Sequence, residues 1–115
     1  MVSQPPQAIS LFADGFAIQN RQQIIEFGMN HHAPVISGWP VFAQSGAICT
    51  YGPRLVGSYR RLAYYVDRVL KGARPAQLPI EQPTEFQLVV NLKTAKALGL
   101  TIPPTLLVRA DDIIE

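Results

Sequence analysis

Residues 86–100 have the sequence FQLVVNLKTAKALGL, which joins two short segments of different character. The run from Phe86 to Asn91 is apolar, which predicts a short buried strand. The residues from Leu92 to Leu98 predict a short helix, because Asn91 can cap its first turn and Gly99 can end it. A strand that leads directly into a capped helix is a typical building step of an α/β fold.

The strongest helical pattern lies upstream, from Pro53 to Lys71. Its apolar residues are spaced four, three, four and three apart and so form one stripe of a helix: Leu55, Tyr59, Leu62, Val66 and Val69. Pro53 suits the first turn, because the N–H that proline lacks would be unpaired there. Gly72 is expected to end the helix.

Strands and helices alternate along the rest of the chain. We predict strands at 9–13, 34–37 and 47–51, a helix at 18–31, a short helix or turn at 39–45, and a last short helix at 105–114. Residues 73–84 are proline-rich and predict an extended crossing segment, and residues 1–8 a flexible arm. The continuous apolar strands predict a parallel sheet with helices on both faces, in a single α/β domain over 9–115.

Composition limits the possible functions. The chain has 115 residues, of which 48% are apolar and 16% are charged, and its net charge is +2. The apolar share is enough to build one hydrophobic core. Basic residues gather on the long predicted helix and its exit, but no recognition motif accompanies them, so we expect no nucleic-acid partner. No leading basic and apolar segment resembles an export signal. We therefore expect a cytoplasmic protein as written, or a periplasmic or membrane-associated one if a longer exported precursor exists.

The sequence offers little for catalysis. Cys49 is the single cysteine and lies in an apolar run, which favours a buried thiol over a nucleophile. His31 and His32 are adjacent, and no further ligands follow at metal-binding spacing. No phosphate loop, nucleophile–base set or carboxylate pair is present. We expect no enzyme activity, no metal and no cofactor.

Three predicted strand ends carry the candidate ligand contacts. In open parallel sheets, ligands bind beyond the carboxyl ends of the strands. The residues at these ends are Asp14, Ser37, Gly38, Trp39 and Tyr51. Asp14 could pair with a ligand ammonium group, and Trp39 or Tyr51 could stack on an apolar or aromatic solute. Each also has a structural interpretation, as a turn residue or as packing at a hydrophobic edge.

Several motifs resemble one family of known proteins. Residues 79–84 have the sequence PIEQPT, residues 91–100 NLKTAKALGL and residues 102–107 IPPTLL, and upstream lie YGP at 51–53 and YVDRVLKG at 65–72. This order is similar to the C-terminal part of ABC-transporter substrate-binding proteins, from about Ala13 onward. The resemblance implies a partial type I periplasmic binding protein fold of the Rossmann-like kind. Whole members have two lobes that close on a small solute and dock on a membrane permease.

Two functions remain open from the sequence. The first is a solute-binding module that takes a small molecule such as an amino acid, with aromatic amino acids as candidates, and that delivers it to a permease if transport is retained. The alternative is a truncated relative without transport function. Such a relative would form a homodimer through the surface that a missing lobe leaves uncovered.

Overall fold

The computed structural model describes residue 4, residues 6–12 and residues 14–115, and these group into two compact units. The first unit comprises Met1–Gly52 and Gln87–Glu115, and the second comprises Pro53–Phe86. The predicted arm at 1–8 falls partly outside the described residues, as does Ala13 at the end of the first predicted strand. The single domain over 9–115 stays a prediction.

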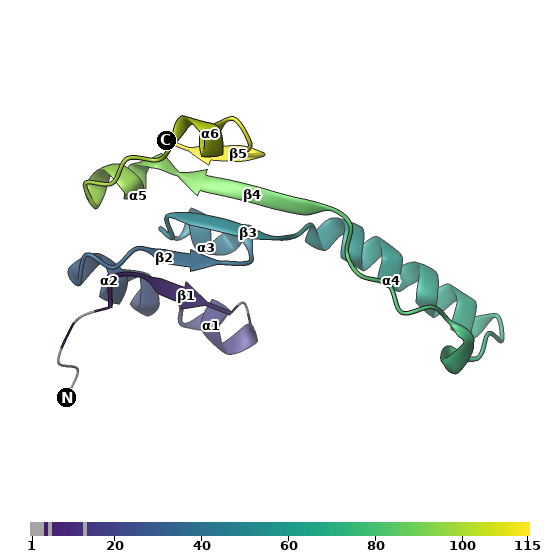
Figure 1. Cartoon of the computed structure of the whole chain (residues 1–115). Helices are drawn as coiled ribbons and strands as arrows, with labels where there is room; N and C mark the ends of the chain where they lie inside the picture. Colours follow the sequence, from purple (N-terminus) through teal and green to yellow (C-terminus); the bar gives the residue numbers. More distant parts are fainter. Residues whose placement is uncertain (1–3, 5, 13) are drawn as a thin grey trace. The chain divides into compact units, whose positions relative to one another are not determined.

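The first unit is built on a five-stranded sheet with the strand order β1-β2-β3-β4-β5 (Figure 1). The strands are β1 (Ile9–Leu11), β2 (Val35–Ser37), β3 (Cys49–Pro53), β4 (Phe86–Asn91) and β5 (Asp112–Ile114). The pairs β1–β2, β2–β3 and β4–β5 are parallel. The predicted α/β fold with a mostly parallel sheet is therefore confirmed.

One strand junction departs from the all-parallel prediction. The arrows of β3 and β4 point in opposite directions in Figure 1, and Asn91 N donates to Ile48 O at 2.9 Å, so that the end of β4 lies beside the start of β3. The carboxyl ends of β1, β2 and β3 thus share one edge of the sheet. The carboxyl ends of β4 and β5 lie at the other edge.

Five helices belong to the sheet unit: α1 (Gly15–Gln19), α2 (Arg21–Asn30), α3 (Pro40–Gln44), α5 (Leu92–Ala97) and α6 (Pro104–Leu107). A buried cluster joins the first three to the sheet through Ala17, Ile25, Val35, Phe42 and Ala47. Val89 and Val90 are adjacent in β4 and both buried, so both faces of this strand are covered.

The predicted helix at 18–31 is two helices. The first helix, α1, begins at Gly15, three residues earlier than expected, because Asp14 caps it: the Asp14 Oδ1 accepts a hydrogen bond from Ala17 N at 2.7 Å. Asn20 interrupts the helix with φ −100° and ψ 11°, and its Nδ2 donates to Phe16 O at 2.9 Å. Its side chain therefore closes α1, and α2 begins at Arg21 without a side-chain cap.

The prediction for the last segment is also wrong. We expected a helix over 105–114, but α6 spans only Pro104–Leu107 and the chain then enters β5. Asp111 supplies the physical reason. Its backbone N donates to Leu88 O, and its Oδ2 accepts from Leu88 N, both at 2.8 Å. These bonds hold the chain against β4 and start the parallel pairing.

The second unit contains the long helix α4 (Leu55–Leu70), the short 3₁₀ helix η1 (Pro75–Gln77) and a returning extended segment. Pro53 belongs to β3 and not to the helix, because Arg54 N still pairs with Glu85 O at 2.9 Å before the helix begins. Gly72 ends the helical region as predicted, with a φ of +96° that favours glycine. We call the returning residues 78–85 the strap.

Candidate functional site

The strand-end edge, formed by the carboxyl ends of β1, β2 and β3, gathers the residues that the sequence analysis selected. The pairing register places Leu11, Ser37 and Thr50 on one level of the sheet. Phe12, Gly38 and Tyr51 follow these residues directly in the chain. The structure thus brings the three chain segments together, and the ligand roles of the individual residues stay predictions.

Asp14 has a structural task at this edge. Its Oδ1 accepts from Ala17 N at 2.7 Å and so caps α1, while the side chain stays exposed. The structural interpretation of the Asp14-Gly15 pair was a turn, and the structure makes Asp14 the N-cap of a helix instead. A ligand ammonium group would have to share the carboxylate with this cap.

Ser37 and Trp39 also have partners inside the protein. Ser37 Oγ donates a hydrogen bond to Leu11 O at 3.0 Å, and this bond links the end of β2 to the end of β1. Trp39 is partly buried and packs against the cluster around Phe42. Its position fits the interpretation of Trp39 as a cover for a hydrophobic edge, while part of its ring stays accessible.

Gly38 and Gly52 approach each other closely. A Cβ atom added at Gly52 would lie 2.0 Å from Gly38 O and 2.9 Å from Gly38 C, which are shorter than the contacts that real Cβ atoms make. The backbone of Gly38 therefore passes over the face of β3 on which a side chain of residue 52 would stand. This approach positions the end of β2 and explains why residue 52 must be glycine.

The sequence analysis missed two aromatic residues at this edge. Phe12 is 88% exposed and Phe16 is 77% exposed, and Tyr51, which was predicted, is 63% exposed. Large apolar side chains that gather in an exposed position often mark a binding surface. The apolar run at 9–13 predicted a strand, and nothing in it indicated that its fourth residue would face outward.

The remaining reactive groups considered in the sequence analysis are Cys49 and the two histidines. Burial raises the pKa of the Cys49 thiol, which favours its protonated, unreactive form. Within the described ranges, no three His, Cys, Asp or Glu side chains gather closely enough to hold a metal ion. His31 stacks on Phe27 at 4.1 Å between ring centroids, and its Nδ1 lies 2.8 Å from Phe27 O.

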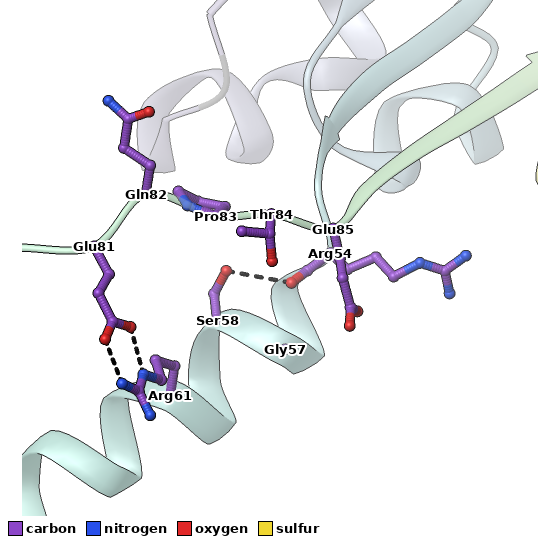
Figure 2. Close-up of a pocket in the computed structure, with 9 residues that line it drawn as sticks. All are labelled: Arg54, Gly57, Ser58, Arg61, Glu81, Gln82, Pro83, Thr84 and Glu85. Atoms are coloured by element: carbon purple, nitrogen blue, oxygen red, sulfur yellow. Dashed lines mark hydrogen bonds and ion pairs between the residues drawn. The ribbon is translucent and has the colours of Figure 1, made fainter.

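The second unit has a cavity of about 650 Å³ between α4 and the strap (Figure 2). Its lining residues come from the first turns of α4 (Arg54, Gly57, Ser58 and Arg61) and from the strap (Glu81, Gln82, Pro83, Thr84 and Glu85). Ser58 Oγ donates to Arg54 O at 3.2 Å, so the hydroxyl bonds back to the carbonyl group one helical turn earlier. Both signs of charge line this cavity.

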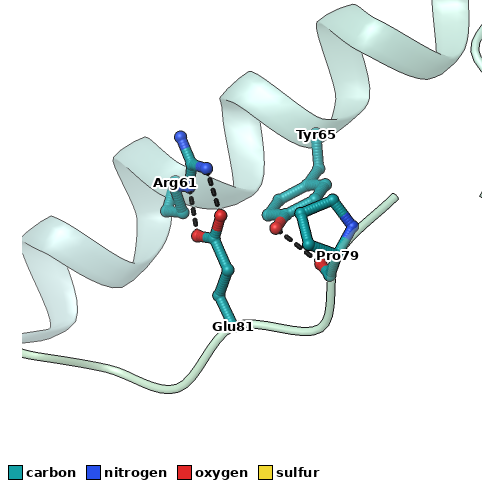
Figure 3. Close-up of polar contacts among 4 residues, drawn as sticks. All are labelled: Arg61, Tyr65, Pro79 and Glu81. Carbon is teal, nitrogen blue, oxygen red and sulfur yellow. Dashed lines mark hydrogen bonds and ion pairs between the residues drawn. The ribbon is translucent and has the colours of Figure 1, made fainter. Parts of the chain in front are cut away.

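Arg61 and Tyr65 fasten the strap to α4 (Figure 3). Arg61 donates two hydrogen bonds to the Glu81 carboxylate, and Tyr65 Oη donates to Pro79 O at 2.7 Å. The Arg61 guanidinium also lies 4.1 Å from the centroid of the Tyr64 ring. The motif PIEQPT therefore supplies an attachment to α4, whose role the sequence alone did not reveal.

Acid is expected to release this attachment. Arg61 holds the pKa of Glu81 below its ordinary value through its hydrogen bonds, so the folded state favours the carboxylate. The stabilisation is complete above the ordinary glutamate pKa of about 4.3 and is lost as the pH falls through the lower folded-state pKa. Amide hydrogen exchange of residues 80–82 should become faster, relative to the unfolded rate at each pH, as the pH falls below about 4.3 and through the lower folded-state pKa of Glu81.

The Glu81→Gln variant is the control for this prediction. Glutamine cannot titrate, so its strap should show faster exchange at neutral pH and no further acid-dependent loosening. Equal exchange protection of the wild-type strap at neutral and acid pH would contradict the role of the ion pair.

Across the part of the chain that is described, no helix has both the length and the apolar character needed to cross a membrane.

Comparisons with solved structures found three chains with a similar fold among those that match. A conserved domain protein from Vibrio cholerae aligns with 93% of this chain at 26% identity and a TM-score of 0.88. The ABC domain in complex with L-Trp from Streptococcus pneumoniae aligns with 94% at 23% identity and a TM-score of 0.86. The ligand-free, open structure of a substrate binding protein with adhesive properties from Clostridium difficile aligns with 94% at 18% identity and a TM-score of 0.60.

The chain spans only part of these structures, namely 36%, 37% and 36% of their lengths, respectively. The comparison with curated proteins found no match. The comparison with protein families matched residues 1–114 to the ABC transporter substrate binding protein family. Because this match covers almost the whole chain, the protein belongs to the ABC transporter substrate binding protein family.

Proposed function

We propose that this chain binds a small solute at the strand-end edge, with an aromatic amino acid as the first candidate. The observation that supports this proposal most directly is the exposure of Phe12, Phe16 and Tyr51 beside the ends of three parallel strands. Exposed aromatic rings at such an edge offer stacking surfaces where α/β folds commonly bind their ligands.

Two comparisons support the proposal. The family consists of substrate-binding proteins and is not an enzyme family. The Streptococcus pneumoniae relative was solved with L-Trp, which makes tryptophan a reasonable first ligand to test. Because the chain spans about a third of that relative, binding by this chain alone is part of the proposal.

Thermal unfolding with a panel of free amino acids tests the proposed function. A ligand that binds only the native state stabilises it by about 2.7 kcal/mol at one hundred times its Kd. We expect tryptophan, phenylalanine and tyrosine to raise the Tm, and aspartate and lysine to leave it unchanged. If no amino acid at millimolar concentration shifts the Tm, the chain does not bind amino acids on its own.

A membrane permease is the partner that a transport role would require. The proposal for this partner rests on family membership alone. Its test is whether the solute-loaded protein stimulates ATP hydrolysis by a reconstituted ABC transporter, with the solute-free protein as the control.

Self-association is the second candidate function, and one surface favours it. The apolar stripe of α4 is solvent-exposed: Leu55 by 36%, Tyr59 by 68%, Leu62 by 57%, Val66 by 50% and Val69 by 41%. Its alternating spacing of four and three residues is that of a coiled-coil seam. A shallow apolar groove along the helix lies between Tyr59 and Leu70. Two copies of α4 could bury these surfaces against each other.

Replacing Leu62 with lysine should abolish this association. The charge would lie in the centre of the stripe, where burial in a helix pair would be costly. Sedimentation velocity at about 100 μM, a concentration at which contacts of about 5 kcal/mol are populated, should show a wild-type dimer and a monomeric variant. Leu100→Lys changes a leucine that is 44% exposed outside α4 and should remain dimeric. A monomeric wild-type protein would exclude this function.

A further inference from the structure

We infer that α4 docks on the surface of an anionic lipid bilayer. The helix would lie along the bilayer, with its apolar side in the boundary between headgroups and acyl chains and its arginines close to the lipid phosphates. This inference goes beyond solute binding, because it concerns the second unit of the protein and a different partner. The partner is a phospholipid surface that carries net negative charge.

The apolar side of α4 is wider than the stripe that a helix pair would bury. The stripe occupies the two seam positions of a heptad, and the position that follows one of them is apolar in each repeat, as Val56, Ala63 and Leu70. Val56 is 66% exposed and Leu70 is 82% exposed. A second helix covers the seam, whereas a flat bilayer covers the full width of this surface. We call the whole set the wide apolar face: Leu55, Val56, Tyr59, Leu62, Ala63, Val66, Val69 and Leu70.

The strap lies on a different side of α4. Arg61 donates to the Glu81 carboxylate. Tyr65 Oη donates to Pro79 O at 2.7 Å, and Figure 3 shows the Arg61 and Tyr65 side chains directed toward the strap. Leu62 follows Arg61 in the chain and therefore points about 100° further round the helix. The strap thus fills one side of α4, and the wide apolar face stays exposed.

Positive charge is concentrated in the same unit. Pro53–Phe86 contains six of the ten basic residues and three of the eight acidic residues, so this unit carries a net charge of +3 and the rest of the chain −1. Arg60 and Arg68 are exposed, and neither forms an ion pair within the part of the chain that the structure describes. An anionic bilayer attracts this charge, whereas a second copy of α4 brings equal charge against it.

The charged and apolar sides of α4 can act on the bilayer together. Arg60 lies one helical turn after Val56, at the margin of the wide apolar face, and its long side chain can reach lipid phosphates while its stem covers apolar surface. A helix with its side chains is about 10–12 Å across, close to the Debye length of about 8–10 Å, so Arg68 on the far side still experiences the surface potential. Tyr59 is 68% exposed, and the amphipathic ring of tyrosine favours the headgroup level.

Co-sedimentation of the full chain with lipid vesicles tests the inference. We expect the wild type at low micromolar concentration to bind vesicles of phosphatidylglycerol and phosphatidylcholine in equal parts, and to bind pure phosphatidylcholine vesicles far more weakly. The Arg60→Gln/Arg68→Gln double variant should bind about 25-fold more weakly, because each cation near such a surface contributes about fivefold. Lys93→Gln/Lys96→Gln removes two exposed charges from α5 and should bind like the wild type.

Leu62→Lys separates insertion of the wide apolar face from attraction by charge alone. It adds a positive charge in the centre of the face, so purely electrostatic binding would become stronger. If the face enters the bilayer, binding should fall by about tenfold, because a leucine side chain loses its burial. Leu100→Lys adds the same charge outside α4, at a leucine that is 44% exposed, and should bind at least as tightly as the wild type. All of the substituted side chains are exposed, so the variants should keep the fold.

Three results would overturn this inference: no binding of the wild type to anionic vesicles, equal binding of the wild type and the double arginine variant, or tighter binding of Leu62→Lys. A protein that is dimeric in the assay and does not bind vesicles would assign the wide apolar face to a second copy. If amino acids fail to shift the Tm, the proposed solute binding fails and this inference stands, because the strand-end edge belongs to the other unit.

Discussion

Replacement of Gly52 by alanine is expected to destabilise the protein by about 3 kcal/mol or more. The new methyl group would lie 2.0 Å from Gly38 O and 2.9 Å from Gly38 C, and both atoms belong to the backbone. A backbone cannot rotate away as a flexible side chain would, so β2 and β3 must separate locally. Urea unfolding monitored by the fluorescence of Trp39, the single tryptophan, measures the change in free energy.

Gly15→Ala is the matched control for Gly52→Ala. A Cβ at Gly15 would meet no atom within 4 Å, and alanine favours the helix that begins there. We expect a free energy of unfolding equal to or slightly above that of the wild type. A Gly52→Ala variant as stable as the Gly15→Ala variant would show that the strand ends are not held as closely as described.

Replacement of Asn91 by alanine is expected to cost about 2–3 kcal/mol. Asn91 is 4% exposed at the end of β4, where its Oδ1 accepts from Thr94 N and its Nδ2 donates to Ala43 O, both at 2.9 Å. One amide group thus caps α5 and joins β4 to α3. Alanine would leave the buried Thr94 N–H without its cap. Chemical denaturation gives the loss directly, and the unfolding transition should move to lower denaturant without a change in slope.

Two variants sharpen this prediction. Asn20→Ala removes a side chain that also bonds to a helix end, but in an exposed position, and should cost less than about 1 kcal/mol. Asn91→Asp keeps the acceptor for Thr94 N and loses the donor to Ala43 O, so it should fall between wild type and Asn91→Ala near neutral pH. Equal losses for the two alanine variants would contradict the importance of burial at Asn91.

The sequence predicted those elements whose start and end signals are local. The strand Phe86–Asn91 has the bounds predicted for it, and α5 differs from its prediction by one residue, because Asn91 caps the helix and Gly99 adopts a φ of +68°. The final strand β5 escaped prediction because its pairing depends on Asp111 and Leu88, which are 23 residues apart. The antiparallel direction of β4 relative to β3 was not predicted either, since a long connection allows two neighbouring strands to run in the same or in opposite directions.

The candidate site was predictable only in its location. The apolar strands and the turns after them indicated that Gly38 and Tyr51 lie at the ends of strands. They could not indicate that Asp14 would cap a helix or that Phe12 would be exposed, because both depend on where the first helix begins. The attachment of the strap to α4 could not be predicted from the sequence either, since Arg61 and Glu81 come into contact only after the chain reverses at Gly72.

The antiparallel pairing of β3 with β4 has a consequence for how this fold can be modified. Antiparallel neighbours need only a two-residue turn to connect them. Here the connection contains α4, η1 and the strap, yet its first and last residues are joined by a hydrogen bond from Arg54 N to Glu85 O. In topological terms, residues 55–84 are an insertion into a β-hairpin. Their replacement by Asn-Gly would preserve the strand order, and the sheet could be studied as a minimal protein of its own.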